Sequence, residues 1–225
     1  MPTRANALAV MAKAPIPGMV KTRLVPPLTN DQAAELSGAL LADLLDHVQN
    51  LSGAERYLFF APDYAAALMS DLAGARFHLL AQRGADLGAR MQGVFTDLWA
   101  RGYRRIVLIG GDLPGFPLNV LEQAFAWLDT PAQRVVLGPS RDGGYYLAGM
   151  NSLALEIFAG MTWSHSRVLS DTLEKIKSLR VEAMQLPLWF DVDTPADLAQ
   201  LRQLVLSSGE SMKNTAAVLR QITFY

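Results

Sequence analysis

The sequence predicts an α/β protein built on a mostly parallel sheet. Short apolar runs that are typical of buried strands alternate with longer stretches whose apolar residues recur at helical spacing. This alternation indicates βαβ units. Of the 225 residues, 51% are hydrophobic and only 18% are charged, so a large core is available. We expect one domain over residues 1–206, with an acceptor-side subregion at about 139–190, and a C-terminal tail over 207–225.

Strands are predicted where apolar residues run without interruption, at 5–12, 56–61, 76–81, 104–109, 134–138, 144–150 and 181–186. Residues 13–28 are predicted as a loop because prolines and Gly18 interrupt them. The segment 134–150 contains Asp142-Gly143 between apolar runs, which predicts a hairpin and one antiparallel pair.

Helices are predicted where apolar residues recur at intervals of three and four, at 30–50, 65–73, 86–101, 118–128, 154–159, 167–179 and 195–206. Thr29 with Gln32 forms a capping box for the first helix. Thr194, Pro195 and Asp197 form a complete start signal for the last one. Residues 207–210 are predicted as a polar linker, and 211–225 as a short helix or tail that packs on the domain or on a second subunit of a homodimer.

Composition excludes several classes of function. The formal charge of −1 gives no electrostatic reason to expect nucleic acid or an anionic membrane as a partner. The absence of cysteine excludes disulfides, thiol catalysis and Cys-based metal sites, and it fits a cytoplasmic protein. The three histidines lie too far apart in sequence for a His-based metal site. The apolar run near the N-terminus is short and stops at Lys13, so it indicates a buried strand rather than an export signal.

Parallel sheets bind ligands at the carboxyl ends of their strands, so residues that follow strands are candidates for the functional site. The loop after the first strand carries Lys13, Lys21 and Arg23 close to Gly18. Such cations bind phosphate, although a solvated surface loop with lysines is an equal alternative. The loop matches neither the Walker A pattern nor the Rossmann glycine pattern.

Carboxylates follow later strands. Asp112, after Ile109-Gly110-Gly111, could bind a divalent cation, but it could also belong to a turn or cap a helix. Asp191 and Asp193 are not explained by the helix start signal that follows them. In an extended segment they would face the same side, where two carboxylates repel unless a cation screens them. This spacing favours a metal role.

Two further segments have weaker signals. The residues Gln82, Gly84, Asp86 and Gly88 follow a strand and are candidates for nucleobase or ribose contact, although a loop entering a helix capped by Asp86 explains them as well. The segment 138–146 is explained as a hairpin, while its paired glycines would also let a ligand approach the backbone. Trp163 could line a pocket or be an ordinary buried aromatic, and His165 is better explained as a polar residue at a helix entry.

Five motifs in this order resemble a known family: K-x-P-x-x-G-x-x-K-T-R-L, D-L-G-x-R-M, G-G-D-x-P, G-P-x-x-D-G-G-Y-Y-L and D-V-D-T-P-x-D-L. They resemble radical-SAM/selenodomain-associated transferase 1, of the nucleotide-diphospho-sugar transferase superfamily. They are also similar to phospholactate and phosphoenolpyruvate guanylyltransferases and, more distantly, to molybdenum-cofactor guanylyltransferases. The sequence departs from the pattern at Gly111 and at His165, where many relatives have Gly-Thr-Asp-Cys-Pro and Trp-Ser-Thr-Pro.

The resemblance implies a three-layer α/β/α, Rossmann-like fold of the A-type glycosyltransferase kind. It implies that the N-terminal loop wraps the nucleotide phosphates, through Lys13, Pro15, Gly18, Lys21, Thr22 and Arg23. It implies Mg²⁺ or Mn²⁺ held by Asp112, Asp191 and Asp193. It places Asp142, Gly143, Gly144, Tyr145 and Trp163 around an acceptor pocket.

The leading hypothesis is Mg²⁺-dependent transfer of a nucleotidyl group from an NTP to a small phosphorylated or carboxylated acceptor. Lys21, Arg23 and Asp112 are the expected catalytic residues. The alternatives are glycosyl transfer from a nucleotide sugar on the same fold and a non-catalytic nucleotide-binding module. The base and the acceptor stay open at this point.

Overall fold

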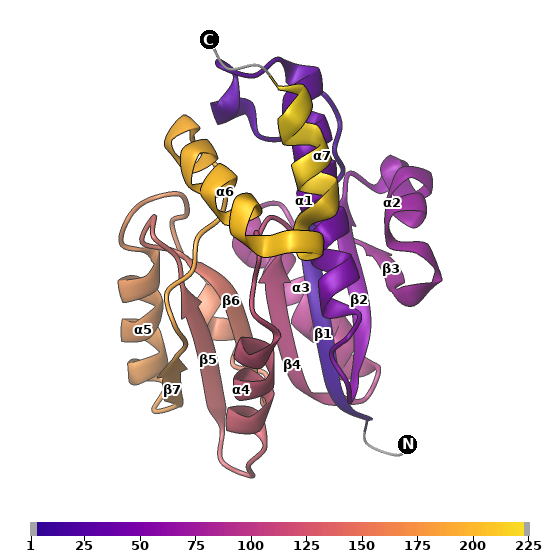
Figure 1. Ribbon diagram of the computed structural model, residues 1–225. Helices are drawn as coiled ribbons and strands as arrows, with labels where there is room; N and C mark the ends of the chain where they lie inside the picture. Colours follow the sequence, from indigo (N-terminus) through magenta and orange to yellow (C-terminus); the bar gives the residue numbers. More distant parts are fainter. Residues whose placement is uncertain (1–3, 223–225) are drawn as a thin grey trace.

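A computed structural model of the chain describes residues 4–222 and forms three layers, with helices on both faces of one sheet (Figure 1). The sheet has seven strands in the order β3-β2-β1-β4-β6-β5-β7. The strands are β1 (Arg4–Lys13), β2 (Ala54–Ala61), β3 (His78–Ala81), β4 (Tyr103–Gly110), β5 (Arg134–Pro139), β6 (Tyr145–Met150) and β7 (Glu182–Gln185). The predicted strands are therefore all present, with ends that differ by a few residues.

The helices also lie where periodicity predicted them. They are α1 (Asn30–Val48), α2 (Ala66–Ala73), α3 (Leu87–Ala100), α4 (Leu118–Leu128), α5 (Val168–Ser178), α6 (Pro195–Ser208) and α7 (Lys213–Gln221). The capping box predicted at Thr29 is formed, and α6 begins after Thr194 as its start signal predicted, also with a capping box. No helix within residues 4–222 combines the length and the apolar character that crossing a bilayer requires.

The sheet is mixed, as the hairpin signal predicted. β1 pairs in parallel with β2 and β4, β2 with β3, and β5 with β7. β6 runs antiparallel to both β4 and β5. Because the parallel strands run in one direction, their carboxyl ends and the loops that follow them meet along one edge of the sheet, at the top of Figure 1.

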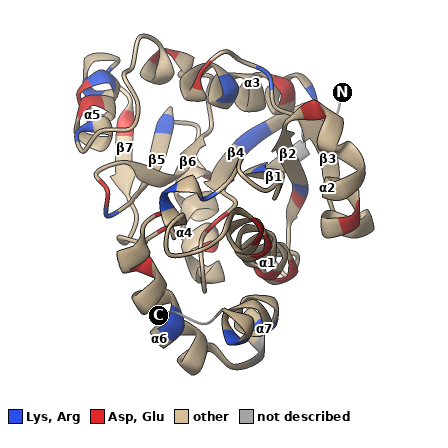
Figure 2. Ribbon diagram, turned by 90° about the horizontal axis from the view of Figure 1, so that it is seen from above, with Lys and Arg blue, Asp and Glu red and all other residues tan. Residues whose placement is uncertain are grey.

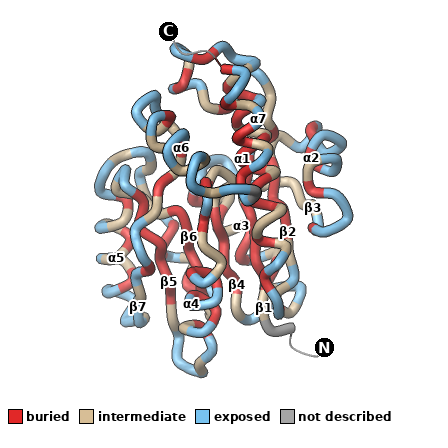
Figure 3. Tube along the Cα trace, in the orientation of Figure 1, coloured by how far each residue is buried: buried red, intermediate tan, exposed pale blue. Residues whose placement is uncertain are grey.

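Two apolar cores cover the two faces of the sheet. In β1, Leu8 and Val10 face α1, α2 and α4, whereas Ala7 and Ala9 face α3 and α5. Figure 2 shows these helix groups on opposite sides, and Figure 3 shows buried residues following the strands and the inner sides of the helices. A strand buried on both faces needs apolar residues at every position, which explains why β1 reads as a continuous run.

A third core lies on the outer side of α1. There Leu36 and Leu40 pack against Leu198 and Leu201 of α6 and Leu219 of α7. The C-terminal tail therefore packs on its own chain as far as residue 222, and residues 223–225 lie outside the described part. Figure 2 shows α6 and α7 beyond the layer of α1 and α4.

Three predicted segments differ from the structure. The predicted linker at 207–210 is the last turn of α6 followed by a 3-10 turn, Gly209–Met212, because Met212 is buried in the third core. The predicted helix at 154–159 is a 3-10 turn, Leu155–Phe158, whose Phe158 stacks on Phe95 at 5.7 Å between ring centroids. The strand predicted at 76–81 begins later because a 3-10 turn occupies Gly74–Arg76.

Candidate active site

Two adjoining clefts lie at the carboxyl ends of the strands and share Met11, Leu87 and Asp112. The first, which we call the basic cleft, has a volume of about 400 Å³ and is lined by the cations Lys13, Lys21, Arg23 and Arg90. The second, which we call the apolar cleft, has a volume of about 250 Å³. Its walls are mainly apolar, and they include Met11, Leu87, Met91, Tyr145, Trp163 and Val168. Asp112 therefore stands at the junction of two chemically different spaces.

Lys21 lies at this junction and is almost completely buried. Its backbone is left-handed (φ 49°), which turns the chain into a 3-10 turn at Thr22–Leu24. Only 6% of its side chain is exposed, and its Nζ donates a short hydrogen bond to Oδ2 of Asp112 and lies 3.9 Å from Oδ1 of Asp193. Burial lowers the pKa of the Lys21 ammonium, but Asp112, Asp193 and Asp191 together outweigh burial and raise this pKa above its ordinary value. The ammonium is therefore held charged among carboxylates.

Asp191 and Asp193 face the same side of an extended segment, as their spacing predicted. Val192 between them is fully buried in the third core, so the two aspartates point toward the clefts. The segment follows β7 along the edge of β5, where the backbone N–H of Trp189 donates to the carbonyl of Pro139. Its carboxyl end is set by the capping box of α6.

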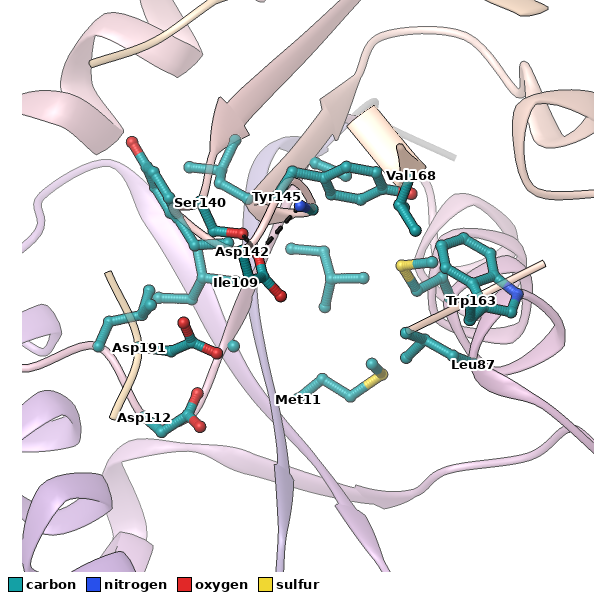
Figure 4. A pocket seen from close by; sticks show the side chains of 18 of the residues that line it. Met11, Leu87, Ile109, Asp112, Ser140, Asp142, Tyr145, Trp163, Val168 and Asp191 are labelled. Carbon is teal, nitrogen blue, oxygen red and sulfur yellow. Dashed lines mark hydrogen bonds between the residues drawn. The ribbon is translucent and has the colours of Figure 1, made fainter. Parts of the chain in front are cut away.

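The two aspartates differ in their surroundings. Asp193 accepts a hydrogen bond from Nη1 of Arg23 at 2.8 Å, which neutralises it. Asp191 lies opposite Asp112 at one end of the apolar cleft, and Figure 4 shows their carboxylates side by side. Burial, with a further contribution from the Asp112 charge, raises the pKa of Asp191 to about 6. A cation close to this carboxylate would therefore stabilise its charged form.

The donor set at this junction consists of carboxylate oxygens, which suits Mg²⁺ or Mn²⁺. Within residues 4–222, no three acidic or histidine side chains already surround one point closely enough to hold a metal. Instead, the Lys21 ammonium lies between Asp112 and Asp193 and provides the positive charge that these carboxylates need. Asp112 and Asp191 are the residues that could hold a divalent cation here, and Lys21 contacts Asp112 in this structure.

The remaining N-terminal loop residues divide between the cleft and the scaffold. Lys13, Thr22 and Arg23 line the basic cleft. Pro15 does not line it, and packs close to Gly38 of α1. Gly18 does not line it either: it has φ +77°, which a glycine adopts without strain, and it supplies the turn of the loop.

The segment that follows β3 is used mainly for structure. Gln82 lines the basic cleft, and its amide nitrogen donates to the carbonyls of Ala12 and Phe59, each at 2.9 Å. Asp86 accepts from the backbone N–H of Ala89 at 2.8 Å and caps α3. Gly84 and Gly88 lie outside the basic cleft.

Both of these glycines are explained by packing. A Cβ atom at Gly84 would lie 2.6 Å from the backbone of α3 at Ala89. At Gly88 it would lie 2.8 Å from the carbonyl of Phe158 and 2.9 Å from the Trp163 ring. Gly88 therefore packs closely against Trp163, which lines the apolar cleft.

The predicted acceptor residues come together at the apolar cleft. Asp142, Gly144, Tyr145 and Trp163 line it, and the rings of Tyr145 and Trp163 meet edge to face, with centroids 6.5 Å apart. Asp142 is held by the Ser140 hydroxyl and by the backbone N–H of Gly144 at 2.9 Å (Figure 4).

Gly143 does not line the apolar cleft. It has φ +89°, and an added Cβ would lie 2.1 Å from the Ser166 carbonyl oxygen. Glycine is thus required at this position for the close approach of the segment before α5.

Sequence reasoning missed some lining residues. Arg90 lines the basic cleft from α3, and its place in the D-L-G-x-R-M motif was the available signal. His165 lines the apolar cleft, but both of its ring nitrogens are engaged within its own loop, by the Thr162 carbonyl at 3.0 Å and the Arg167 N–H at 3.2 Å. This agrees with the interpretation of His165 as a polar residue at a helix entry.

Comparison with known proteins identifies similar chains. Residues 44–165 match the bacterial family DUF2064, described as an uncharacterized protein conserved in bacteria. A phosphoenolpyruvate guanylyltransferase from Conexibacter woesei is 27% identical over 215 residues, covering 90% of each chain. A protein from Desulfovibrio desulfuricans G20, provisionally named a nucleotide-diphospho-sugar transferase, is 33% identical; its crystal structure has a TM-score of 0.87 and the match covers 97% of this chain and 95% of that one.

A more distant likeness extends to the inositol-1-phosphate CTP transferase from T. maritima. It is 17% identical, with a TM-score of 0.55, and the match covers 92% of this chain and 97% of that one. At this identity the likeness concerns the fold alone. Together the comparisons confirm the expected nucleotide-diphospho-sugar transferase fold and the resemblance that the motifs indicated.

Proposed function

Because the chain belongs to the bacterial DUF2064 family and is a transferase, we propose that it transfers a nucleotidyl group from an NTP to a small phosphorylated or carboxylated acceptor, with Mg²⁺ or Mn²⁺. The name of the Conexibacter relative supports nucleotidyl transfer. So does the chemistry of the basic cleft, whose cations match the charge of a triphosphate.

The observation that carries this proposal is the position of Lys21. It is a buried ammonium that contacts Asp112 at the junction of a basic and an apolar cleft. A structural ion pair would not need a second and a third carboxylate nearby, because one partner neutralises the charge. The excess of aspartates over this lysine is best explained if a further cation joins them during the reaction.

In the proposed reaction the triphosphate enters the basic cleft. Lys13, Arg23 and Arg90 bind its outer oxygens, and Lys21 moves from Asp112 to the phosphates. Asp112 and Asp191 are then free to hold the divalent cation, which would supply neutralisation of the charge on the reacting phosphate. The acceptor oxygen approaches from the apolar cleft, and Lys21 and Arg23 stabilise the pyrophosphate that leaves.

Glycosyl transfer from a nucleotide sugar is the second candidate. The name of the Desulfovibrio relative, which is 33% identical, favours it. The same cleft would then hold a diphosphate that becomes the leaving group, so both candidates use the same cations.

Product analysis distinguishes the two candidates. Incubation with NTP, Mg²⁺ and an acceptor should release pyrophosphate, whereas the alternative predicts release of a nucleoside diphosphate from a sugar nucleotide. Lys21→Met should lower kcat by about 100-fold or more, the loss typical when one donor to a developing charge is removed. Asp112→Ala should abolish turnover.

The matched control is Lys177→Met, which removes an exposed lysine of α5. It should retain wild-type turnover. Circular dichroism should show that each variant keeps its fold. Wild-type turnover by Asp112→Ala in a folded protein would refute the assigned role.

A further inference from the structure

The two clefts differ in charge as well as in polarity. Among the described residues that line the apolar cleft there is no lysine or arginine, whereas Asp112, Asp142 and Asp191 all contribute carboxylates. The basic cleft next to it holds the cations. Lys21 and the proposed divalent cation compensate Asp112 and Asp191, so an anionic group at the Trp163 end of the apolar cleft would meet the Asp142 carboxylate with no lysine or arginine lining the cleft beside it.

Three cations in the segments that form the apolar cleft have other partners and do not line it. Arg141, in the hairpin turn, bonds to Gln200 and lies 5.2 Å from the Phe190 ring centroid. Arg167 lies 3.4 Å from Asp171, and the Lys175 ammonium bonds to the carbonyl of Ala159. Both ring nitrogens of His165 are engaged within its own loop. No lysine or arginine side chain among the described residues therefore lines the apolar cleft, and Lys21 contacts only its Asp112 end.

The walls of the cleft offer apolar surface and a hydrogen-bond acceptor. Figure 4 shows Trp163 and Leu87 at the end away from Asp112 and Asp191, with Asp142 between the two ends. One oxygen of Asp142 is used by Ser140 and Gly144, and the carboxylate points toward the cavity. An aromatic face beside a carboxylate suits a group with an apolar side and hydroxyl donors.

We propose that the acceptor carries a single anionic group, which reacts at the junction beside Lys21, and that the rest of the acceptor is uncharged. Its body packs an apolar side against Trp163 and directs a hydroxyl toward Asp142. A second carboxylate or phosphate on the acceptor is disfavoured, because it would be desolvated next to Asp142, the lining carboxylate that the proposed divalent cation does not neutralise. This inference rests on the proposed function, and it narrows the acceptor class that the proposed function leaves open.

Matched acceptor probes test this directly. Glycerol 3-phosphate and 3-phosphoglycerate share a carbon skeleton and differ in a hydroxymethyl group against a carboxylate, and phenyl phosphate tests the aromatic wall. Binding of each is measured by calorimetry on the full chain with Mg²⁺, with and without a non-hydrolysable NTP analogue. Glycerol 3-phosphate and phenyl phosphate should bind at least tenfold more tightly than 3-phosphoglycerate.

Variants of the cleft residues test which side chains cause the binding preference among the probes. Trp163→Ala should weaken phenyl phosphate binding severalfold, while the control Trp127→Ala, on α4 and outside both clefts, should not. Asp142→Asn keeps a hydrogen-bond acceptor for the hairpin turn and removes a charge, so it should reduce the discrimination against 3-phosphoglycerate.

The outcomes distinguish failure of the acceptor proposal from failure of the proposed nucleotidyl transfer. Equal or tighter binding of 3-phosphoglycerate overturns the uncharged acceptor body, and so does failure of every probe to bind while the NTP analogue still binds. Failure of the NTP analogue to bind, with the preference among the probes intact, counts against nucleotidyl transfer and leaves the acceptor preference supported.

Discussion

At the residue scale, the candidate site depends on how charge is balanced around Lys21. This side chain is 6% exposed, and it is held charged because its ammonium donates a hydrogen bond to the Asp112 carboxylate while the negative charges of Asp193 and Asp191 lie nearby. Arg23 neutralises Asp193 from the solvent side. Burial, with a further contribution from the Asp112 charge, raises the pKa of Asp191, whereas the surrounding carboxylates raise the pKa of Lys21.

The raised pKa of Asp191 predicts a pH-dependent effect on stability. Its folded-state pKa of about 6 lies above the unfolded value of ~3.9, so the protonated form favours folding and this contribution is lost as pH rises through 6. Without divalent cations, Asp191→Asn should therefore melt at a higher temperature than wild type at pH 8. The difference should shrink as pH falls below 6, where Asp191 is neutral in the folded protein, and it should vanish only near pH ~4, where the carboxyl is protonated in the unfolded chain as well.

The matched control is Asp193→Asn, which removes a carboxylate that Arg23 already neutralises. It should not stabilise the protein at any pH between 5 and 8. The melting temperatures of wild type, Asp191→Asn and Asp193→Asn, measured across this pH range, test the prediction. A higher melting temperature of Asp191→Asn that persists unchanged at pH 5 would contradict the assigned titration.

At the element scale, the C-terminal helix α7 is attached to the domain by one buried carboxylate. Asp43 of α1 is 5% exposed and accepts from the backbone N–H groups of Asn214 at 3.0 Å and Thr215 at 2.8 Å, and from the Asn214 amide at 2.8 Å. These N–H groups belong to the first turn of α7, which has no side-chain cap of its own. Asp43 therefore caps α7 from a neighbouring helix.

Asp43→Ala should destabilise the protein by about 1–3 kcal/mol, because it leaves buried donors unsatisfied. For a chain of this length that corresponds to a fall in Tm of roughly 2–12 °C. Asp46→Ala is the control on the same helix: its pairs with Arg76 at 2.6 Å and with Lys213 of α7 at 3.8 Å are partly exposed, and each such pair contributes about 0–1 kcal/mol. Equal shifts for the two variants, measured by chemical or thermal denaturation, would show that the capping role is wrong.

At the scale of the whole molecule, the sheet separates two kinds of surface at its carboxyl edge. The loop after β1 and the start of α3 supply the cations of the basic cleft. The hairpin of β5 and β6, together with the segment before α5, supplies the walls of the apolar cleft. The junction lies at Asp112, in the loop after β4. The nucleotide and the acceptor of the proposed reaction would therefore meet at the centre of the molecule and not at its rim.

Nucleotide binding should therefore stabilise the whole fold. A ligand at 100 times its Kd stabilises the native state by ~2.7 kcal/mol, which corresponds to a rise in Tm of about 5–11 °C for a chain of this size. In a thermal-shift panel, the preferred NTP should produce this rise only with Mg²⁺ or Mn²⁺ present, and Lys21→Met should reduce it. The same shift with and without a divalent cation would contradict the proposed metal dependence.

The sequence by itself determined the elements and the segments of the candidate site. Apolar runs and helical periodicity placed the strands and helices, Thr29 and Thr194 marked helix starts, and the chemistry after each strand identified the segments that meet at the clefts. These are local properties, because hydrogen bonds of caps and turns join residues that are close in the chain.

Only the tertiary structure decided which residues of each segment face the clefts and which partners they meet. Lys21 bonds to Asp112, 91 positions away, and Arg23 to Asp193, 170 positions away. Gly88 lies beneath Trp163 and outside the basic cleft, although its motif suggested a nucleotide contact. Such pairings depend on the strand order of the sheet and on the crossing of distant loops, and neither is encoded in the local pattern of any one segment.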